Sequence, residues 1–346
     1  MSFALLKEFN RKSVLAYARA RQPRNYIGAT LFPVNIGNEL SFEYWKTLNL
    51  LPVMASVQAY GAEAQIASRD GATKVSGEIP PIKRKINLNE RDLIALKREG
   101  AGDVDMVRNT LYNDLDNMID SVYARVEKMR CDTFSYGSLT LNENGVVMTV
   151  DYGVPGGQIV DSPATNTYDG DWNQANAEPI TVMQAWVNTV IAGCGIRPTR
   201  ALTSNTVVAN LIKSAQIRKM IYGDQGGSRA VSLNQVNDLL ATLDLPQIAT
   251  YDTQVRAQAE DGTYSTLRFF PEKKIVLLPP DQLGETLMGP TAEALLDNEV
   301  EARESAGIYA RVDAVEEPPA VWTKAAATAI PTFPMADAVF IATVLP

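Results

Sequence analysis

The sequence predicts an α+β protein with more than one lobe, and three observations support this class. Apolar residues from Val104 to Met129 recur at steps of three and four, the spacing of one long helix with a single narrow apolar face. An extended segment with hairpin signals precedes this helix, and a compact pattern of alternating helices and strands follows it. The length of 346 residues exceeds the roughly 250–300 at which a single core stops growing, so two or more lobes are expected.

The first part of the chain is predicted to be an arm. Residues 1–25 contain the acidic residue Glu8 among basic ones, which indicates a solvated basic arm. Residues 26–50 are predicted to be extended, because Pro33 and Gly37 interrupt any helix.

The stretch from Val53 to Leu88 is predicted to be a long hairpin. Small and apolar residues alternate in two arms, and Asp70 and Gly71 form the turn signal at the tip. Large apolar residues are few, and the basic run Lys83–Lys85 would protect an exposed strand edge. Because a two-stranded ribbon is marginal alone, we expect this hairpin to rest on another surface as an interaction arm.

Two helices are predicted next. A short helix runs from Asn89 to Glu99, and a long helix runs over 104–136 and spans roughly 50 Å at about 1.5 Å per residue. Acidic residues begin the long helix and basic residues gather near its end, an order that complements the helix dipole.

The remainder predicts a compact lobe and a β-rich tail. A hairpin over 138–152 turns at Asn144 and Gly145, and residues 304–346 contain three β runs. Between these two parts lie the predicted elements of the lobe: a helix through Met183 to Ile191, helices at 205–221 and 233–243, strands at 199–204, 247–252 and 274–279, and a hairpin about Asp261 and Gly262.

Charge and cysteine content restrict the function classes. The net charge is −8 and is uneven, because residues 1–100 are basic and residues 101–346 are acidic. An acidic body argues against a dedicated nucleic-acid binder, whereas opposite charges on two parts suit a protein that binds copies of itself. No apolar run approaches the ~18 residues of a membrane span. Cys131 and Cys194 are typical of buried thiols in a reducing compartment, which predicts synthesis in the cytosol.

The sequence offers no catalytic inventory. It contains no histidine, which removes imidazole bases, the Ser-His and Cys-His nucleophile pairs and the commonest metal ligand. Asp116 and Asp120 lie one turn apart on the long helix, but no facing basic cluster is evident, so a solvated acidic face is predicted. No catalytic residue, cofactor or metal ligand is therefore predicted, and a carboxylate-based hydrolase stays open as an outside alternative.

The order of these parts resembles the lambda-type (E family) major capsid protein of tailed bacteriophages. The resemblance rests on an LFP-containing extension, SRDG at the hairpin tip, PPIKRKI on its return, the long helix, VDYG after it and PDQLGETLMGPTAEA before the tail. It implies the Hong Kong 97-type fold, whose parts would be an N-terminal arm at 1–52, an extended loop at 53–88, a peripheral domain at 89–176 and 281–346 with a spine helix, and an axial domain at 177–280.

The resemblance also implies a function and partners. The chain would self-assemble into hexamers and pentamers of an icosahedral shell in the bacterial host cytoplasm and then reside in the virion. A separate scaffolding protein, a portal, a decoration protein and packaged double-stranded DNA would be its other partners, with no membrane. An encapsulin-type nanocompartment shell shares this fold and is the first alternative.

Subunit contacts are predicted at the tip of the hairpin and at its basic residues. The candidates are Arg69, Asp70, Gly71, Lys74, Lys83, Arg84 and Lys85. Some members of the fold join subunits by an isopeptide bond from a loop lysine to an asparagine, and Lys74 stands where the donor would be. Residues 299–346 contain neither Asn nor Gln, so a shell held by non-covalent contacts is expected.

Overall fold

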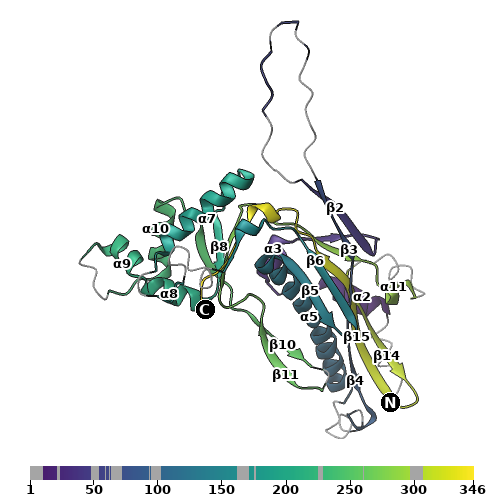
Figure 1. Ribbon diagram of the computed structural model, residues 1–346. Helices are drawn as coiled ribbons and strands as arrows, with labels where there is room; N and C mark the ends of the chain where they lie inside the picture. The colour runs from purple at the N-terminus through teal and green to yellow at the C-terminus, as the bar shows by residue number, and fades with distance from the viewer. Residues whose placement is uncertain are drawn as a thin grey trace. The chain divides into compact units, whose positions relative to one another are not determined.

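The computed structural model describes residues 11–21, 24–47, 54–58, 60, 61, 63, 72–92, 94, 103–161, 171–174, 177–224, 229–259, 261–296 and 307–346 (Figure 1). The chain divides into two compact units. Unit 1 comprises Met1–Phe42, Gly77–Arg130 and Glu285–Thr332. Unit 2 comprises Glu43–Ser76, Cys131–Gly284 and Phe333–Pro346. In the described part of the chain, no helix is both long and apolar enough to cross a bilayer.

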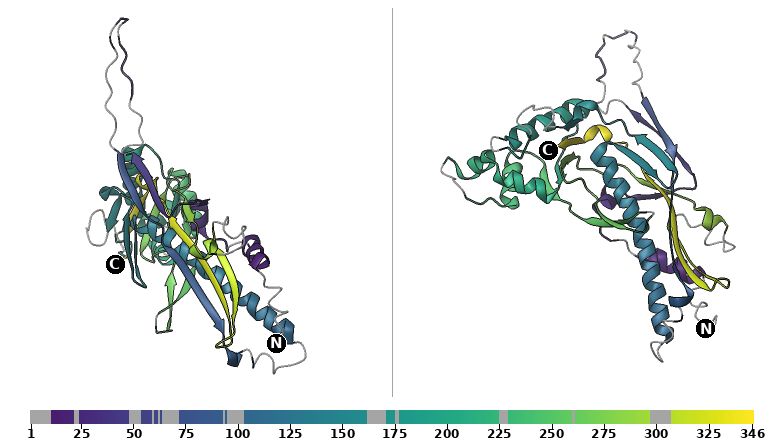
Figure 2. Two further views of the ribbon diagram at one scale, coloured as in Figure 1. Left: turned by 90° about the vertical axis from the view of Figure 1, so that its right-hand side faces the viewer. Right: turned by 60° about the horizontal axis from the view of Figure 1, so that its bottom comes forward.

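Unit 1 is built from the long helix and a sheet of strands distant in sequence. Helix α5 (Asp103–Tyr136) begins one residue before the predicted start. Its side chains from Leu111 to Val122 pack against alanines of the sheet, Ala310, Ala325 and Ala327. These small residues let the helix approach the strands closely, and each fully buried Leu or Val stabilises the fold by about 1.5–3 kcal/mol. Figure 2 shows the ribbon of the chain from two further directions.

The sheet of unit 1 has five strands. Their order is β1 (Val34–Ile36), β13 (Thr286–Gly289), β15 (Ala320–Pro331) and β14 (Tyr309–Val315), with β4 (Pro81–Leu88) also paired to β15. Strand β4 runs antiparallel to β15, with Pro81 opposite Thr328 and Leu88 opposite Val321. The return arm of the predicted hairpin is therefore a strand of the sheet of unit 1, so this arm rests on another part of the protein, as expected. The sequence did not show that it does so by pairing with a strand of its own chain.

The first arm of the hairpin begins earlier than predicted. Strand β2 (Ser41–Thr47) pairs with β3 (Ala72–Glu78) in a sheet of two strands, so the ladder starts before Val53. The predicted tip at Asp70 and Gly71 lies outside the described residues. Of the short helix predicted from Asn89 to Glu99, residues 90–92 are helical. Residues 95–99 lie outside the described part of the chain.

The N-terminal arm is more structured than the sequence indicated. Helix α2 (Arg11–Ala20) buries Val14 and Ala18 in the core around α5. A second short helix, α3 (Ile27–Leu31), precedes Pro33, where the sequence predicted only extended chain. The prediction assumed that Pro33 excludes a helix, but a proline ends a helix that lies before it.

Helix α5 is buried more widely than one narrow stripe. Between Ala124 and Arg130 the buried positions include two charged residues, Glu127 at 0% and Arg130 at 3% exposure. Glu127 and Arg130 form an ion pair with each other. This side of α5 is therefore buried although it carries charged residues. The prediction of a single narrow apolar face was wrong for this part of the helix.

Unit 2 contains a mixed five-stranded sheet and its helices. The strand order is β7 (Ile159–Asp161), β16 (Phe340–Thr343), β12 (Lys274–Leu278), β8 (Arg200–Thr203) and β9 (Gln247–Thr250). The helices are α7 (Pro179–Cys194), α8 (Asn205–Lys213), α9 (Ala215–Tyr222) and α10 (Leu233–Thr242). Strands β7 and β16 come from outside 177–280, so the sheet recruits chain beyond the range predicted for this lobe.

The core and turns of unit 2 follow from local sequence. Trp186 stacks on Trp172 and on Phe340, with ring centroids 6.0 and 5.1 Å apart. The hairpin of β5 (Ser138–Glu143) and β6 (Val146–Asp151) turns at Asn144 and Gly145, both with positive φ, as predicted. The second predicted hairpin is also present, as β10 (Gln254–Gln258) and β11 (Tyr264–Arg268). The single helix predicted over 205–221 is two helices, because Ser214 adopts extended backbone between them.

Candidate assembly surfaces

The N-terminal arm is held on α5 by charged contacts that the sequence did not predict. Arg21 lies 2.9 Å from Asp116 and 3.0 Å from Asp120, and Arg24 lies 3.4 Å from Asp120. The Tyr17 hydroxyl donates to Asp116 at 2.8 Å, which raises the pKa of Tyr17. The prediction of a solvated acidic face was therefore wrong, because the facing basic residues lie 95 or more positions earlier in the chain.

A second contact fixes α3 against the same helix. The backbone N–H of Gly28 donates to Glu127 Oε1 at 2.8 Å. Arg130 lies 3.5 Å from the same carboxylate and donates to the hydroxyl of Thr286, on β13, at 2.8 Å. One buried pair thus joins the arm, the long helix and the sheet of unit 1.

Lys46 anchors strand β2 within unit 2. Its ammonium lies 2.5 Å from the carbonyl oxygen of Gly153 and 2.7 Å from Asp337, and its side chain is 6% exposed. A buried lysine is stable when it is paired in this way. The strand that leads into the extended segment therefore has a fixed root.

The predicted interface candidates on the two strands contact their own chain. Lys74 pairs with Glu43 at 2.7 Å, and Lys83 pairs with Glu293 at 2.8 Å. The ammonium of Lys85 lies 4.7 Å above the ring of Trp322. Arg84 lies between Lys83 and Lys85 in sequence and on the opposite side of β4. Arg69, Asp70 and Gly71 lie outside the described residues. No candidate described here is an unpaired charge, and exposed pairs of this kind contribute only about 0–1 kcal/mol.

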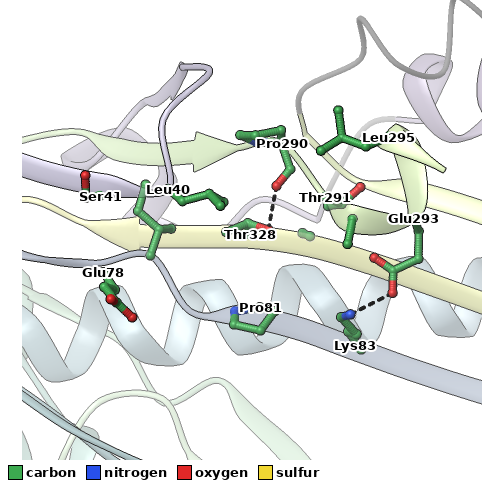
Figure 3. A pocket seen from close by; sticks show the side chains of 13 residues that line it. Leu40, Ser41, Glu78, Pro81, Lys83, Pro290, Thr291, Glu293, Leu295 and Thr328 are labelled. Carbon is green, nitrogen blue, oxygen red and sulfur yellow. Dashed lines mark hydrogen bonds and ion pairs between the residues drawn. The ribbon is translucent and has the colours of Figure 1, made fainter.

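A groove opens beside β4 in unit 1. It has a volume of about 440 Å³. The first residues of β4, the C-terminal half of β15 and the segment Pro290–Leu295 line it (Figure 3). Helix α11 (Ala292–Leu295) shapes one wall, with the Thr291 hydroxyl accepting from the Ala294 N–H. Gly289 allows the chain to pass close to Glu39, since a Cβ there would lie 2.7 Å from the Glu39 carbonyl oxygen.

Seven of the exposed large apolar side chains lie between Val34 and Tyr60. In unit 1 they are Val34, Ile36 and Leu40, at 46, 60 and 58% exposure. In unit 2 the exposures are higher, and the side chains are Trp45 at 64%, Met54 at 92%, Val57 at 100% and Tyr60 at 110%. Large exposed apolar residues of this density mark interaction surfaces.

The sequence predicted an interaction arm over 53–88, but these apolar residues were not named among its contact candidates. The candidates named were mostly charged residues, whereas Met54, Val57 and Tyr60 are spaced three apart among small residues and form no helical stripe. Within the described residues, no group of three or more acidic, Cys or His side chains could hold a metal ion.

Comparison with known proteins gives the family and the fold. The family model described as phage major capsid protein E matches residues 14–344. A protein assigned as the capsid protein of a prophage of Escherichia coli CFT073 has 12% sequence identity and a TM-score of 0.62, over 97% of this chain and 99% of that one. A phage-related protein of Bordetella bronchiseptica RB50 has 11% identity and a TM-score of 0.51, over 96% and 97%.

Two further comparisons concern an encapsulin structure and the curated protein sequences. An encapsulin complex of Synechococcus elongatus PCC 7942 reaches a TM-score of only 0.36 at 11% identity, over 96% of this chain and 95% of that one. No curated protein sequence matches the chain. At these identities the structural likenesses establish the fold alone, and it is the Hong Kong 97-type capsid fold expected from the sequence.

Proposed function

Because the chain belongs to the phage major capsid protein E family, it is a major capsid protein of a tailed phage, and we propose that its copies join through the exposed stretch 34–60. In this proposal the copies form hexamers and pentamers that close into an icosahedral shell around double-stranded DNA. The role is structural, and the chain supplies no catalytic step.

The observation that carries the proposal is the exposure of that stretch. Met54, Val57 and Tyr60 are between 92 and 110% exposed, so their own chain gives them almost no cover. In water such a surface is an aggregation hazard, whereas burial against a neighbouring copy removes it from water and stabilises the assembly. Within the stretch, the ion pair of Lys46 with Asp337 holds the end of strand β2 in place, which lowers the entropy lost on binding.

The remaining expectations follow from this assignment. The division into arm, extended loop, peripheral domain and axial domain is proposed at the boundaries given above, with Arg69, Asp70 and Gly71 at the loop tip as contact residues. A separate scaffolding protein, a portal and a decoration protein are the proposed partners, and assembly is proposed to occur in the host cytoplasm. The family match favours the phage shell over an encapsulin-type compartment.

Assembly of the purified chain tests the proposal. The full chain is expressed with and without its scaffolding protein, and the products are examined by light scattering and negative-stain microscopy over a range of salt concentrations. Closed shells of uniform diameter are expected. Only monomers or dimers under every condition would contradict the proposal, and hydrolytic activity of a discrete dimer would instead favour an enzyme.

A further inference from the structure

The ribbon formed by β2 and β3 is joined to the rest of unit 2 by side chains rather than by a strand ladder. Its part in unit 2 comprises residues 43–47 and 72–76. Among the described strands, β2 and β3 pair only with each other, and neither joins the five-stranded sheet of unit 2. Strand pairing therefore does not determine how this β2–β3 ribbon lies on unit 2.

Alternate side chains of β2 make the attachment. Successive side chains of a strand point to opposite faces, so Tyr44 and Lys46 face the rest of unit 2, whereas Trp45 points away from it and is 64% exposed. The Tyr44 hydroxyl accepts a hydrogen bond from the Phe333 N–H at 3.2 Å. Burial raises the pKa of Tyr44 to about 12, so its hydroxyl stays neutral. Of these two inward polar side chains, only Lys46 is charged.

Lys46 makes directional contacts in a buried place. Its ammonium lies 2.7 Å from the Asp337 carboxylate, and the two side chains are 6 and 13% exposed. The ammonium also donates to the carbonyl oxygen of Gly153, so acceptors on two separate segments fix its position. Gln158 Nε2 in turn donates to the backbone carbonyl of Asp337 at 3.1 Å and holds that segment. Apolar burial has no preferred direction, whereas hydrogen bonds do.

A buried ion pair of this kind contributes little to stability. The loss of hydration of both charges offsets most of their attraction, and apolar residues of similar volume often replace such a pair without loss of stability. We propose that the Lys46–Asp337 pair determines the direction in which the β2–β3 ribbon leaves unit 2, and thereby limits the copies to shells of one diameter, instead of stabilising the subunit. The second part rests on the proposed function, because β2 leads toward the exposed residues Met54 and Val57.

Replacement of the pair by apolar residues separates direction from stability. Lys46→Met with Asp337→Leu removes both charges and keeps the side-chain volumes similar. Amide hydrogen exchange of β12, in the sheet of unit 2, should be as slow in this double variant as in the wild type, or slower. Asp337→Leu alone leaves the buried ammonium without its carboxylate, so exchange in the ribbon should become about 100-fold faster or more. Faster exchange of β12 in the double variant would show that the pair stabilises the subunit and would overturn the proposal.

Spin labels measure the direction of the ribbon in the free chain, without any need for assembly. One label at Thr73→Cys lies on β3 and the other at Gln184→Cys lies on α7, and both positions are exposed. The native thiols, Cys131 and Cys194, are buried at 0 and 2% exposure and take up little label. The distances between labels, from electron spin resonance, should be narrowly distributed in the wild type and spread in the double variant. The same narrow distribution in both chains would contradict the proposal.

A matched ion pair on the outer face of the ribbon is the control. Lys74→Met with Glu43→Leu removes a pair of the same length, 2.7 Å, whose side chains are 43 and 53% exposed. The label distances in this control should equal those of the wild type. If the control spreads the distances as much as the double variant, loss of any charge pair on the ribbon has the same effect, and the assignment to Lys46 and Asp337 is wrong.

Shell diameter measures the consequence for assembly. In negative-stain microscopy the wild type should give shells of one diameter, whereas the double variant should give open particles or shells of mixed diameter. Uniform shells of wild-type diameter from the double variant would refute the link between ribbon direction and shell. If the wild type forms no shell under any condition, the proposed function fails, whereas the label distances still decide whether Lys46 and Asp337 direct the ribbon.

Discussion

Replacement of Gly28 by Ala tests the clamp between α3, α5 and β13. A Cβ at this position would lie 2.5 Å from Glu127 Oε2, closer than Cβ atoms approach oxygen in folded proteins. The carboxylate is fully buried and cannot swing into solvent, so the variant must give up the hydrogen bond from Gly28. A hydrogen bond to a charged group contributes about 1.5–3 kcal/mol, and overpacking adds about 1–3 kcal/mol.

The helical position of Gly28 offsets part of this cost. Gly28 lies in α3, where alanine is favoured over glycine by about 1 kcal/mol. The net destabilisation of unit 1 is therefore expected to be about 1.5–5 kcal/mol. In a Glu127→Ala background both the clash and the hydrogen bond are absent, so Gly28→Ala should be neutral or slightly stabilising there.

Amide hydrogen exchange of α5 residues 111–126 measures this free energy in unit 1 directly. Gly37→Ala is the matched control, because nothing lies within 4 Å of the Cβ that it adds. The reasoning is refuted if Gly28→Ala has the same effect with and without the Glu127 carboxylate, or if the control destabilises α5 equally.

Three further predictions concern charge and covalent linkage. Burial raises the pKa of Glu293, but its pairing with Lys83 outweighs burial and lowers that pKa in the folded protein. The pair therefore stabilises unit 1 at pH values above the ordinary carboxyl pKa of about 4.3. This stabilisation is lost as the pH falls through the lower pKa of the folded state. Glu293→Gln should flatten the decline of the urea midpoint on acidification, and an unchanged decline would contradict the assignment. Reversal of Lys83, Arg84 and Lys85 to Glu should weaken subunit association, and salt should reduce the difference because exposed charges are screened over about 8 Å at physiological ionic strength; equal defects at low and high salt would count against this. Boiling shells in detergent and reductant should release one band near 37.8 kDa, because Lys74 is paired within its own chain and 299–346 lacks an acceptor amide, whereas a ladder would show covalent linkage.

Local patterns predicted the elements that depend on local physics. The long helix, the turns at Gly145 and Gly262 and the three β runs of the tail are present where periodicity and turn chemistry placed them. The turn predicted at Asp70 and Gly71 lies outside the described residues. The helix bounds differ by one residue at the start. These features depend on residues close in sequence, which a single sequence displays.

Contacts between distant segments could not be predicted in this way. The pairing of β4 with β15 joins residues more than two hundred positions apart, and nothing in the hairpin sequence distinguishes it from a free arm. The burial of Glu127 depends on Gly28 and Arg130 together, so the helical pattern alone suggested an exposed charge. Charged contacts within one chain cannot be read from the sequence either, so the basic residues of the hairpin were predicted to contact other subunits. In the structure, Lys74 and Lys83 pair with glutamates of their own chain, whereas Met54, Val57 and Tyr60 are exposed.

Substitution of that stretch tests the central claim most directly. The triple change Met54→Ser, Val57→Ser and Tyr60→Ser removes no buried side chain, so the unfolding of the free subunit should change by less than about 0.5 kcal/mol per position. Analytical ultracentrifugation of equal amounts of wild type and variant, with scaffolding protein present, then measures the fraction of chain in closed shells. We predict that the variant stays in small species while the wild type assembles; a variant that forms shells in wild-type yield and with wild-type stability would contradict the account.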